Sequence, residues 1–381
     1  MGVPRFCYLG ALTLCAGMLA CGSGSGTSGG GKSTGGGGGT SQTGSPVYVT
    51  NASSGSVSVY QMNQTSGALQ RTTGSPVMTG GSSPDSMTTD PSKKFLLVAN
   101  SSSSTISVFS VDSSTAALTR VTGSPFATLA SVVRIVMHPS GNFVYTLSST
   151  PAQIQGYSFN STTGVLSPLS GFPVSLSASG EMGLTISPKG GVLYTSNPNT
   201  DTINSFVIAA NGSLTPLATT TPLQGSPIYL TFDTTGNFLF GVNVGGSLGT
   251  GSVSTFSVAV TGALTEIAGS PVLAATAPVN AVFSQGFLYV VNQTSSSVSA
   301  FGLNSSTGLL TELKGSPFAV GARPVSAAPA VLGRFLIVTS SASSNGGSIL
   351  VFAIAADGTL TQVTGSPFTP DTPVPNQVIA F

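Results

Sequence analysis

The amino-acid sequence predicts an all-β protein, a seven-bladed β-propeller with four-stranded antiparallel blades. A turn resembling Gly-Ser-Pro recurs about every 48 residues, a period typical of propeller blades. The composition, with 49 Gly and 24 Pro among 381 residues, favours short strands joined by turns. No segment sustains a helical period. The seven turns contain Pro76, Pro125, Pro173, Pro222, Pro271, Pro317 and Pro367.

One repeat shows the four strands that we expect in each blade. Asp85–Asp90 is the first strand, and Phe95–Asn100 is a continuous apolar run, typical of a strand covered on both faces. Thr105–Val111 alternates between apolar and polar residues. Ala117–Thr122 is shorter and more polar, as expected of an outer strand, and it runs into the Gly-Ser-Pro turn.

Aromatic residues occupy one position of the third strand in every repeat. Such a column could stack against a ligand. Its recurrence in every repeat instead favours packing between blades, where each buried ring contributes on the order of 1.5–3 kcal/mol. The residues are Tyr60, Phe109, Tyr157, Phe206, Phe256, Phe301 and Phe352.

The two ends of the repeat region predict how the ring closes. The region starts with a second strand, Val47–Asn51, and ends with a first strand, Asn376–Phe381. We therefore expect the C-terminal strand to pair with the N-terminal strands and complete one blade. This pairing removes the open edges of the ring.

Residues 1–20 have the layout of a secretory signal. Arg5 precedes the apolar run Phe6–Ala20, which is too short to span a membrane. The sequence Met18-Leu19-Ala20-Cys21 resembles the lipobox of bacterial lipoproteins, which implies cleavage before Cys21 and a diacylglycerol group on its thiol. No cysteine follows Cys21, so no disulfide is expected after cleavage. An ordinary signal peptide cut elsewhere is the alternative.

Residues 21–46 comprise the lipidated cysteine and a tether rich in Gly and Ser, with Lys32 as its single charge. Such a segment cannot bury enough apolar surface to offset its ordering entropy, so we expect a flexible coil. The propeller occupies residues 47–381. These features predict an exported, monomeric protein that is held to the bacterial cell envelope, as a periplasmic or outer-membrane lipoprotein, by lipid on Cys21.

Charged residues are scarce in this chain, which has 11 Lys or Arg, 10 Asp or Glu and a net charge of +1. The few cations form no cluster that could neutralise a phosphate backbone, so nucleic acid is not an expected partner. The same scarcity leaves few groups for acid and base chemistry.

Aligning the repeats places one polar residue per blade near the entrance of the central channel. Among the catalytic candidates, Arg134 and Arg323 would hold a carboxylate or an oxyanion, and Glu181 or Asp85 would activate water. The alternative is that these charges pair across the entrance and keep it hydrated. The ligand-binding candidates are Tyr229, Asn280, Asn376 and Gln377.

The single histidine, His138, ends a first strand at a position where other repeats have Asp or Ser. We therefore expect it to cap the following turn rather than act as a base. After cleavage the one remaining cysteine is the predicted lipid anchor, so it is not free to form a Cys-His dyad. A single histidine also cannot form a zinc site that needs several histidines. The glycine-rich stretch Gly245–Gly251 lacks the Lys of a phosphate-binding loop. No metal or cofactor is expected.

The segment Phe287–Phe318, followed by a strand that begins with Pro, resembles the lactonase-type seven-bladed propellers. That family includes bacterial 6-phosphogluconolactonase and, more distantly, fungal carboxymuconate-lactonizing enzymes. The resemblance covers nearly all of residues 47–381 and lies in the blade pattern. It implies a lactonase-like propeller.

The motifs of the 6-phosphogluconolactonase branch are altered in this chain. Its Gly-Pro-Arg-His pattern, which runs on to His-Pro, matches Ser131–Gly141. There His138 matches the second histidine, Arg134 replaces the first, and Val133 replaces the arginine. The family's Asn-Glu pair reads Asn100-Ser101, Asn197-Pro198, Asn243-Val244 or Asn292-Gln293, without a glutamate.

These observations predict a binding or scaffold module for an unknown small-molecule or protein ligand. The alternative is a lactone hydrolase, similar to 6-phosphogluconolactonase, with its site at the mouth of the central channel. The second function is implied by resemblance of the fold.

Overall fold

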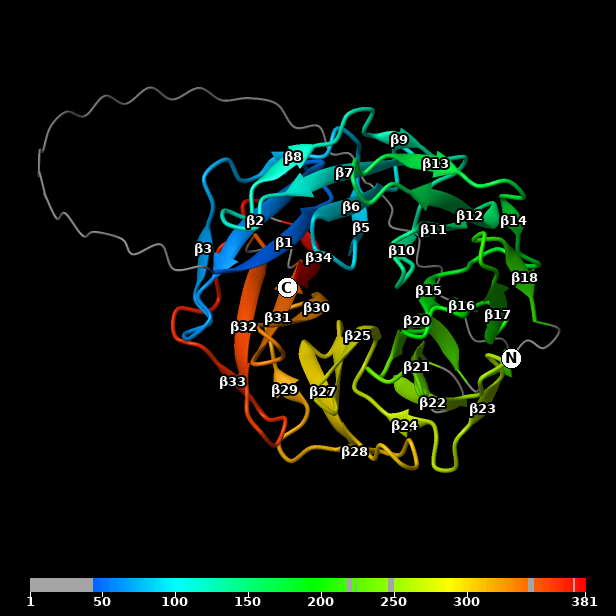
Figure 1. Ribbon diagram of the computed structural model, residues 1–381. Helices are drawn as coiled ribbons and strands as arrows, with labels where there is room; N and C mark the ends of the chain where they lie inside the picture. The colour runs from blue at the N-terminus through cyan, green and yellow to red at the C-terminus, as the bar shows by residue number, and fades with distance from the viewer. Residues whose placement is uncertain (1–43, 218–220, 224, 246–249, 342–345, 373) are drawn as a thin grey trace, which may run out of the picture. The chain divides into compact units, whose positions relative to one another are not determined.

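A computed structural model describes residues 44–381, except 218–220, 224, 246–249, 342–345 and 373. Residues 42–381 form one compact unit. The predicted signal peptide, Cys21 and most of the predicted tether lie outside the described residues. The described part contains strands and turns but no helix, and its seven sheets surround a central axis (Figure 1). The predicted fold class is confirmed.

Each blade is an antiparallel sheet whose strands follow one another outward from the axis, and we name each blade by its inner strand. The inner strands are β5 (Pro84–Thr89), β10 (Arg134–Met137), β15 (Gly183–Ile186), β20 (Ser226–Phe232), β25 (Pro278–Ser284), β30 (Pro324–Ala330) and β34 (Pro375–Ala380). The second strands, in the same order, are β6 (Phe95–Asn100), β11 (Phe143–Ser149), β16 (Val192–Asn197), β21 (Phe238–Val244), β26 (Phe287–Asn292), β31 (Phe335–Ser340) and β1 (Ser45–Asn51).

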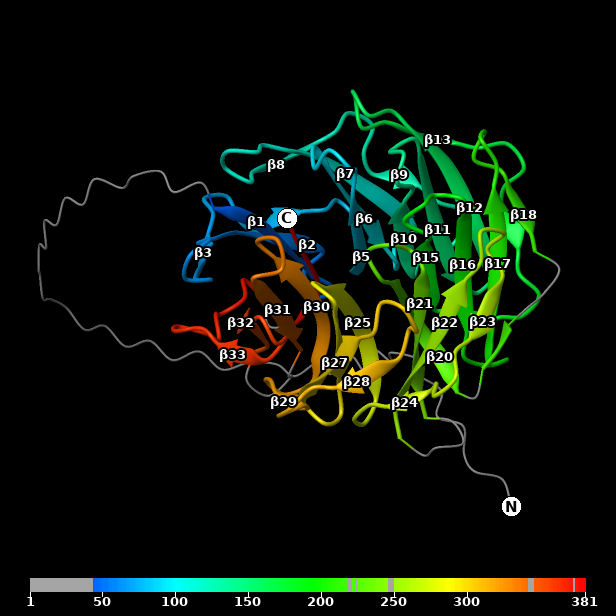
Figure 2. The ribbon, with the colours of Figure 1, turned by 60° about the horizontal axis from the view of Figure 1, so that its bottom comes forward.

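The third and outer strands complete the blades, and Figure 2 shows the blades side by side around the ring. The third strands are β7 (Thr105–Val111), β12 (Ala152–Phe159), β17 (Thr202–Ile208), β22 (Ser252–Val258), β27 (Ser297–Leu303), β32 (Ser348–Ile354) and β2 (Ser56–Met62). The outer strands are β8 (Leu118–Arg120), β13 (Leu166–Pro168), β18 (Leu214–Pro216), β23 (Leu264–Glu266), β28 (Leu310–Glu312), β33 (Leu360–Gln362) and β3 (Leu69–Arg71).

Six blades carry one additional two-residue strand that pairs with the third strand. These short strands are β4 (Val77–Met78), β9 (Phe126–Ala127), β14 (Val174–Ser175), β19 (Thr221–Pro222), β24 (Val272–Leu273) and β29 (Phe318–Ala319). Five of these short strands directly follow the recurrent proline, and the sixth, β19, contains Pro222 itself.

The C-terminal strand closes the ring, as predicted. In Figure 1, β34 lies beside β1, and Val378 pairs with Val49 in an antiparallel register. The closed blade therefore has the order β3-β2-β1-β34. Its inner strand comes from the far end of the chain.

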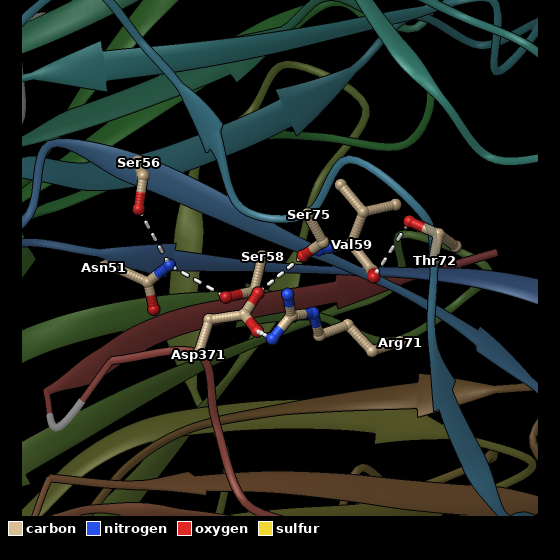
Figure 3. A network of polar contacts seen from close by, with 8 residues as sticks. All are labelled: Asn51, Ser56, Ser58, Val59, Arg71, Thr72, Ser75 and Asp371. Atoms are coloured by element: carbon tan, nitrogen blue, oxygen red, sulfur yellow. Dashed lines mark hydrogen bonds and ion pairs between the residues drawn. The ribbon is translucent and has the colours of Figure 1, made fainter.

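Polar contacts around Asp371 reinforce this closure (Figure 3). The Asp371 carboxylate forms an ion pair with Arg71 at 2.9 Å and accepts a hydrogen bond from the Ser75 hydroxyl. That hydroxyl in turn accepts a hydrogen bond from the backbone N–H of Val59 at 2.9 Å. The segment that leads into β34 is thus bound to the outer part of the blade it completes.

The core consists of seven apolar clusters, each built from the facing sides of neighbouring blades. Each cluster contains one member of the third-strand aromatic column, and every member is buried. This burial confirms that the column packs between blades. It does not form a ligand platform.

Tyrosines of four second strands also bind neighbouring blades together. Each hydroxyl donates a hydrogen bond to a backbone carbonyl in the turn between the third and outer strands of the next blade. The bonds are Tyr48 to Ala116 (2.9 Å), Tyr145 to Gly212 (2.7 Å), Tyr194 to Gly262 (2.9 Å) and Tyr289 to Gly358 (2.9 Å).

Candidate functional site

The inner strands surround a cavity of about 230 Å³ on the propeller axis. All seven inner strands contribute to its wall, and Arg134 and Asp85 are the charged side chains among the described lining residues. A larger surface hollow of about 560 Å³ includes Lys93 and Phe381 but has no acidic side chain in its lining. The axial cavity therefore has the better composition for acid and base chemistry.

The pairing of inner and second strands defines one equivalent position per blade. Six of the seven residues at this position line the cavity, and Gly183 is absent from its described lining. Each residue at this position lies opposite the corresponding residue of its second strand. We call this set the inner ring. It consists of Ser86, Arg134, Gly183, Tyr229, Asn280, Ser326 and Gln377.

The polar residues that the sequence alignment assigns one to each blade therefore do not all share the register position of the inner ring. Asp85 and Asn376 precede the inner ring by one residue, where the pairing of their strands is irregular. Glu181 lies two residues before Gly183, and Arg323 lies three residues before Ser326. The cause is the irregular start of the inner strands, which shifts any alignment made by counting along the chain.

Six of the eight predicted site residues line the cavity, and two do not. Glu181 and Arg323 are absent from its described lining. Arg323 is exposed in the loop before β30, with a positive φ of 53°. The six that meet at the cavity are Asp85, Arg134, Tyr229, Asn280, Asn376 and Gln377.

Asp85 is held by hydrogen bonds from two different blades. Asn376 of β34 donates its amide N–H to Oδ1 at 3.0 Å, and the Ser101 hydroxyl after β6 donates to Oδ2. Burial raises the pKa of Asp85 above its usual value, while these hydrogen bonds and the charge of Arg134 oppose the increase.

Ser101 was not identified from the sequence. It occupies the place of the glutamate in the Asn-Glu pair of 6-phosphogluconolactonases, and that correspondence was the available signal. The many serines of the chain conceal such a residue.

Arg134 supplies the positive charge of the cavity. Its guanidinium carbon lies 5.7 Å from the centre of the Tyr229 ring, a cation–π contact between β10 and β20. Nη1 donates to the Val133 carbonyl at 2.9 Å, and Nε is buried without a hydrogen-bond partner among the described residues. Burial lowers the pKa of Arg134, opposed by Tyr229 and Asp85, but an arginine remains protonated.

Glu181 lies in a separate polar cluster between β16 and β17. Its side chain is buried, and Oε1 accepts a hydrogen bond from the Asn204 amide at 3.1 Å. Oε2 has no hydrogen-bond partner within the described part of the chain. Burial raises the pKa of Glu181 to about 7, against the opposing effect of hydrogen bonds such as that from Asn204.

His138 is engaged at a turn, as expected. Its Nε2 donates to the Gly190 carbonyl of the next blade at 2.7 Å, and Nδ1 accepts from the Ser140 hydroxyl at 2.8 Å. The equivalent Asp90 and Asp233 likewise accept hydrogen bonds from the turns that follow them. The ring therefore fastens two turns together.

Among the described residues, no group of three or more His, Cys, Asp or Glu side chains is arranged to hold a metal ion. The described part of the chain also contains no helix that is long and apolar enough to cross a membrane.

Comparison with solved structures shows the same fold in several bacterial proteins. A candidate 6-phosphogluconolactonase of Bacteroides uniformis has a TM-score of 0.75 and 20% identity, covering 89% of this chain and 100% of its own. A periplasmic gluconolactonase of Pseudomonas aeruginosa has a TM-score of 0.69 and 18% identity, covering 88% and 98%. At these identities the likeness establishes the fold alone. No curated protein matches the chain.

A family model supplies the assignment that these distant structures cannot. The model described as lactonase, 7-bladed beta-propeller, matches residues 31–134, 133–247 and 244–374. These segments cover most of the chain and reach every blade, ending just before β34. The chain therefore belongs to the lactonase family of seven-bladed β-propellers.

Proposed function

We propose that this protein is a lactone hydrolase whose active site is the axial cavity. The observation that carries the proposal is the presence of Asp85 and Arg134 together in the cavity wall. A carboxylate beside a cation supplies a base and an electrostatic partner for a carbonyl oxygen. Membership of the lactonase family supports the same reaction class.

In this mechanism Arg134 holds the lactone carbonyl oxygen and stabilises the negative charge that develops on it. Asp85 accepts a proton from a water molecule as the water oxygen attacks the acyl carbon. The ring C–O bond then breaks, and the proton passes from Asp85 to the departing alkoxide. The product is an open hydroxy acid.

The size and charge of the cavity favour a small, unphosphorylated substrate. Its volume of about 230 Å³ is below the roughly 300–1,000 Å³ typical of drug-sized ligands. Arg134 is the single cation among the described lining residues, whereas a sugar phosphate adds a second anionic group to be bound. We propose a monocyclic sugar or aliphatic lactone.

A panel of sugar and aliphatic lactones, followed by proton release, tests this assignment. Arg134→Gln and Asp85→Asn should each lower kcat/KM by about 100-fold or more, because each removes one partner of the reacting atoms. Arg323→Gln and Glu181→Gln should retain turnover. If Glu181→Gln alone abolished turnover, the site would lie outside the axial cavity.

Binding without turnover is the second candidate function. Both Asp85 oxygens already accept hydrogen bonds, an arrangement that also suits a group that only orients a ligand. The glutamate of the related Asn-Glu motif is replaced throughout this chain. Ligand binding by wild-type protein that turns over none of the lactones would favour this scaffold or binding role.

We further propose that the protein is exported and anchored by lipid on Cys21. The lipobox-like sequence and the following Gly- and Ser-rich segment support this location. Membrane fractionation of wild type and Cys21→Ala protein tests it. The wild type should sediment with membranes and the variant should not, whereas an equally sedimenting variant would refute lipidation as the cause.

A further inference from the structure

Each inner strand has a backbone N–H directed away from its sheet, one residue after the inner ring. These seven N–H groups occupy the same register position, and the preceding blade faces each of them. They belong to Met87, Ile135, Leu184, Leu230, Ala281, Ala327 and Val378.

At four junctions, the inner-ring side chain of the preceding blade accepts this N–H. The hydroxyl and amide acceptors satisfy a backbone donor that the sheet leaves free. The bonds run from Ile135 to Ser86 Oγ (3.2 Å), Ala327 to Asn280 Oδ1 (3.1 Å), Val378 to Ser326 Oγ (3.4 Å) and Met87 to Gln377 Oε1.

The other three junctions are consecutive, and their inner-ring residues are Arg134, Gly183 and Tyr229. An arginine side chain has only donors, and glycine has no side chain, so neither accepts the N–H of Leu184 or Leu230. Both leucines line the axial cavity. Ala281, at the Tyr229 junction, is fully buried and is not part of that lining.

One side of the cavity therefore differs from the other in hydrogen-bonding character. The side formed by β10, β15 and β20 contains two backbone donors without an inner-ring acceptor, and Arg134 lines the same side. The opposite side has its donors occupied by Ser86, Asn280, Ser326 and Gln377. Backbone N–H groups in a cavity that also contains a guanidinium are suited to a carboxylate or an oxyanion.

We propose that the backbone N–H groups of Leu184 and Leu230, together with the Arg134 guanidinium, form an anion subsite for the carboxylate of a hydroxy acid. The buried Nε of Arg134, which has no partner among the described residues, is a further donor available there. This inference rests on the proposed function, since a hydroxy acid is the product of lactone hydrolysis. The same donors would bind the oxyanion formed when water adds to the lactone.

Gly183 provides a test because a side chain can be introduced there without changing Arg134. Gly183→Ser supplies the kind of acceptor found at Ser86 and Ser326, so its hydroxyl should occupy the Leu230 N–H. Gly183→Ala is the matched control, since it adds the Cβ without an acceptor. In both variants the Cβ comes within 2.3 Å of Ser196 Oγ, so the Ser196 hydroxyl must rotate in both.

Calorimetric titration with sodium gluconate should show weaker binding to Gly183→Ser than to Gly183→Ala by about tenfold, the loss expected for one hydrogen bond to a charged group. Equal affinities of the two variants would overturn the subsite. Wild-type protein that does not bind gluconate would overturn it as well.

A measurement on the unaltered chain covers the case in which the variants do not fold. With ¹⁵N-leucine labelling, gluconate should shift the amide signals of Leu184 and Leu230, while Leu193 and Leu239 on second strands serve as internal controls. Gluconate binding that leaves both signals unmoved contradicts the proposal.

Lactone turnover is measured separately on wild-type protein. If the wild type turns over a lactone but Gly183→Ser and Gly183→Ala bind gluconate equally, the subsite is overturned and the hydrolase assignment stands. If gluconate binds more weakly to Gly183→Ser than to Gly183→Ala but no lactone is turned over, the hydrolase assignment alone is overturned.

Discussion

At the residue scale, Glu181 is a buried carboxyl group that lies outside the described lining of the axial cavity, although the sequence placed it near the channel entrance. The residue is 1% exposed, and one carboxyl oxygen has no hydrogen-bond partner among the described residues. Such a group is costly to ionise within the protein. Glu181 therefore influences the stability of the β15 blade, while Asp85 is the carboxyl group that faces the axial cavity.

Glu181→Gln should make the protein more stable above neutral pH. The pKa of Glu181 rises from 4.5 to about 7, so the folded state holds more protons than the unfolded chain between these values. Stability consequently falls as the pH rises through that window. Removing the carboxyl group should stabilise the protein at pH 8 by on the order of 2–3 kcal/mol relative to wild type.

Urea unfolding of both proteins at pH 5 and pH 8 measures this difference. The gain should be large at pH 8 and much smaller at pH 5. Because both proteins contain Asp85, its own titration cancels in the comparison. An equal difference at the two pH values would show that Glu181 does not titrate as described.

At the scale of elements, the strands were largely predictable from the sequence and the site was only partly so. The apolar run Phe95–Asn100 and the alternating run Thr105–Val111 have the bounds of β6 and β7. Burial on one or both faces produces these patterns directly. A strand that lines a channel shows no such pattern, so the sequence did not reveal the irregular starts of β5 and β34. These starts place Asp85 and Asn376 one residue before the inner ring.

The same limit explains which site residues the sequence revealed. Asp85 and Arg134 were conspicuous because charges are rare in this chain. Gly183 gave no signal, and the correspondence of Ser101 to the family's glutamate was easily overlooked, because Gly and Ser are abundant in every repeat. Their roles depend on which neighbouring blade they face, and that is determined by strand register.

The tyrosine contacts between blades predict a stability effect at this scale. Tyr145→Phe removes the hydroxyl that donates to Gly212 and leaves the ring in its apolar cluster. The free energy of unfolding should fall by about 1–2 kcal/mol, since a buried carbonyl loses its partner. Urea denaturation measures the change, and an unaltered midpoint would mean that water replaces the hydroxyl.

At the scale of the whole molecule, closure by β34 couples all seven blades. Deleting residues 376–381 removes most of this strand, including Asn376 and its hydrogen bond to Asp85. It exposes the edges of β1 and of the inner strands that flank β34. We expect cooperative unfolding at a clearly lower temperature, rather than fraying of one end.

Calorimetry of the intact and shortened chains distinguishes these outcomes. A shortened protein that melts in one transition at the temperature of the intact protein would contradict closure by β34. Loss of lactone turnover at temperatures where the shortened protein remains folded would instead reflect the contribution of β34 to the cavity.

The origin of β34 also sets an order of events during synthesis. The blade that contains β1, β2 and β3 is begun first and completed last, because its inner strand is made after every other blade. Until then the nascent polypeptide is an open arc with two unpaired edges, a form prone to association with other chains. The first blade therefore stays exposed to such association until β34 has been made and the ring can form.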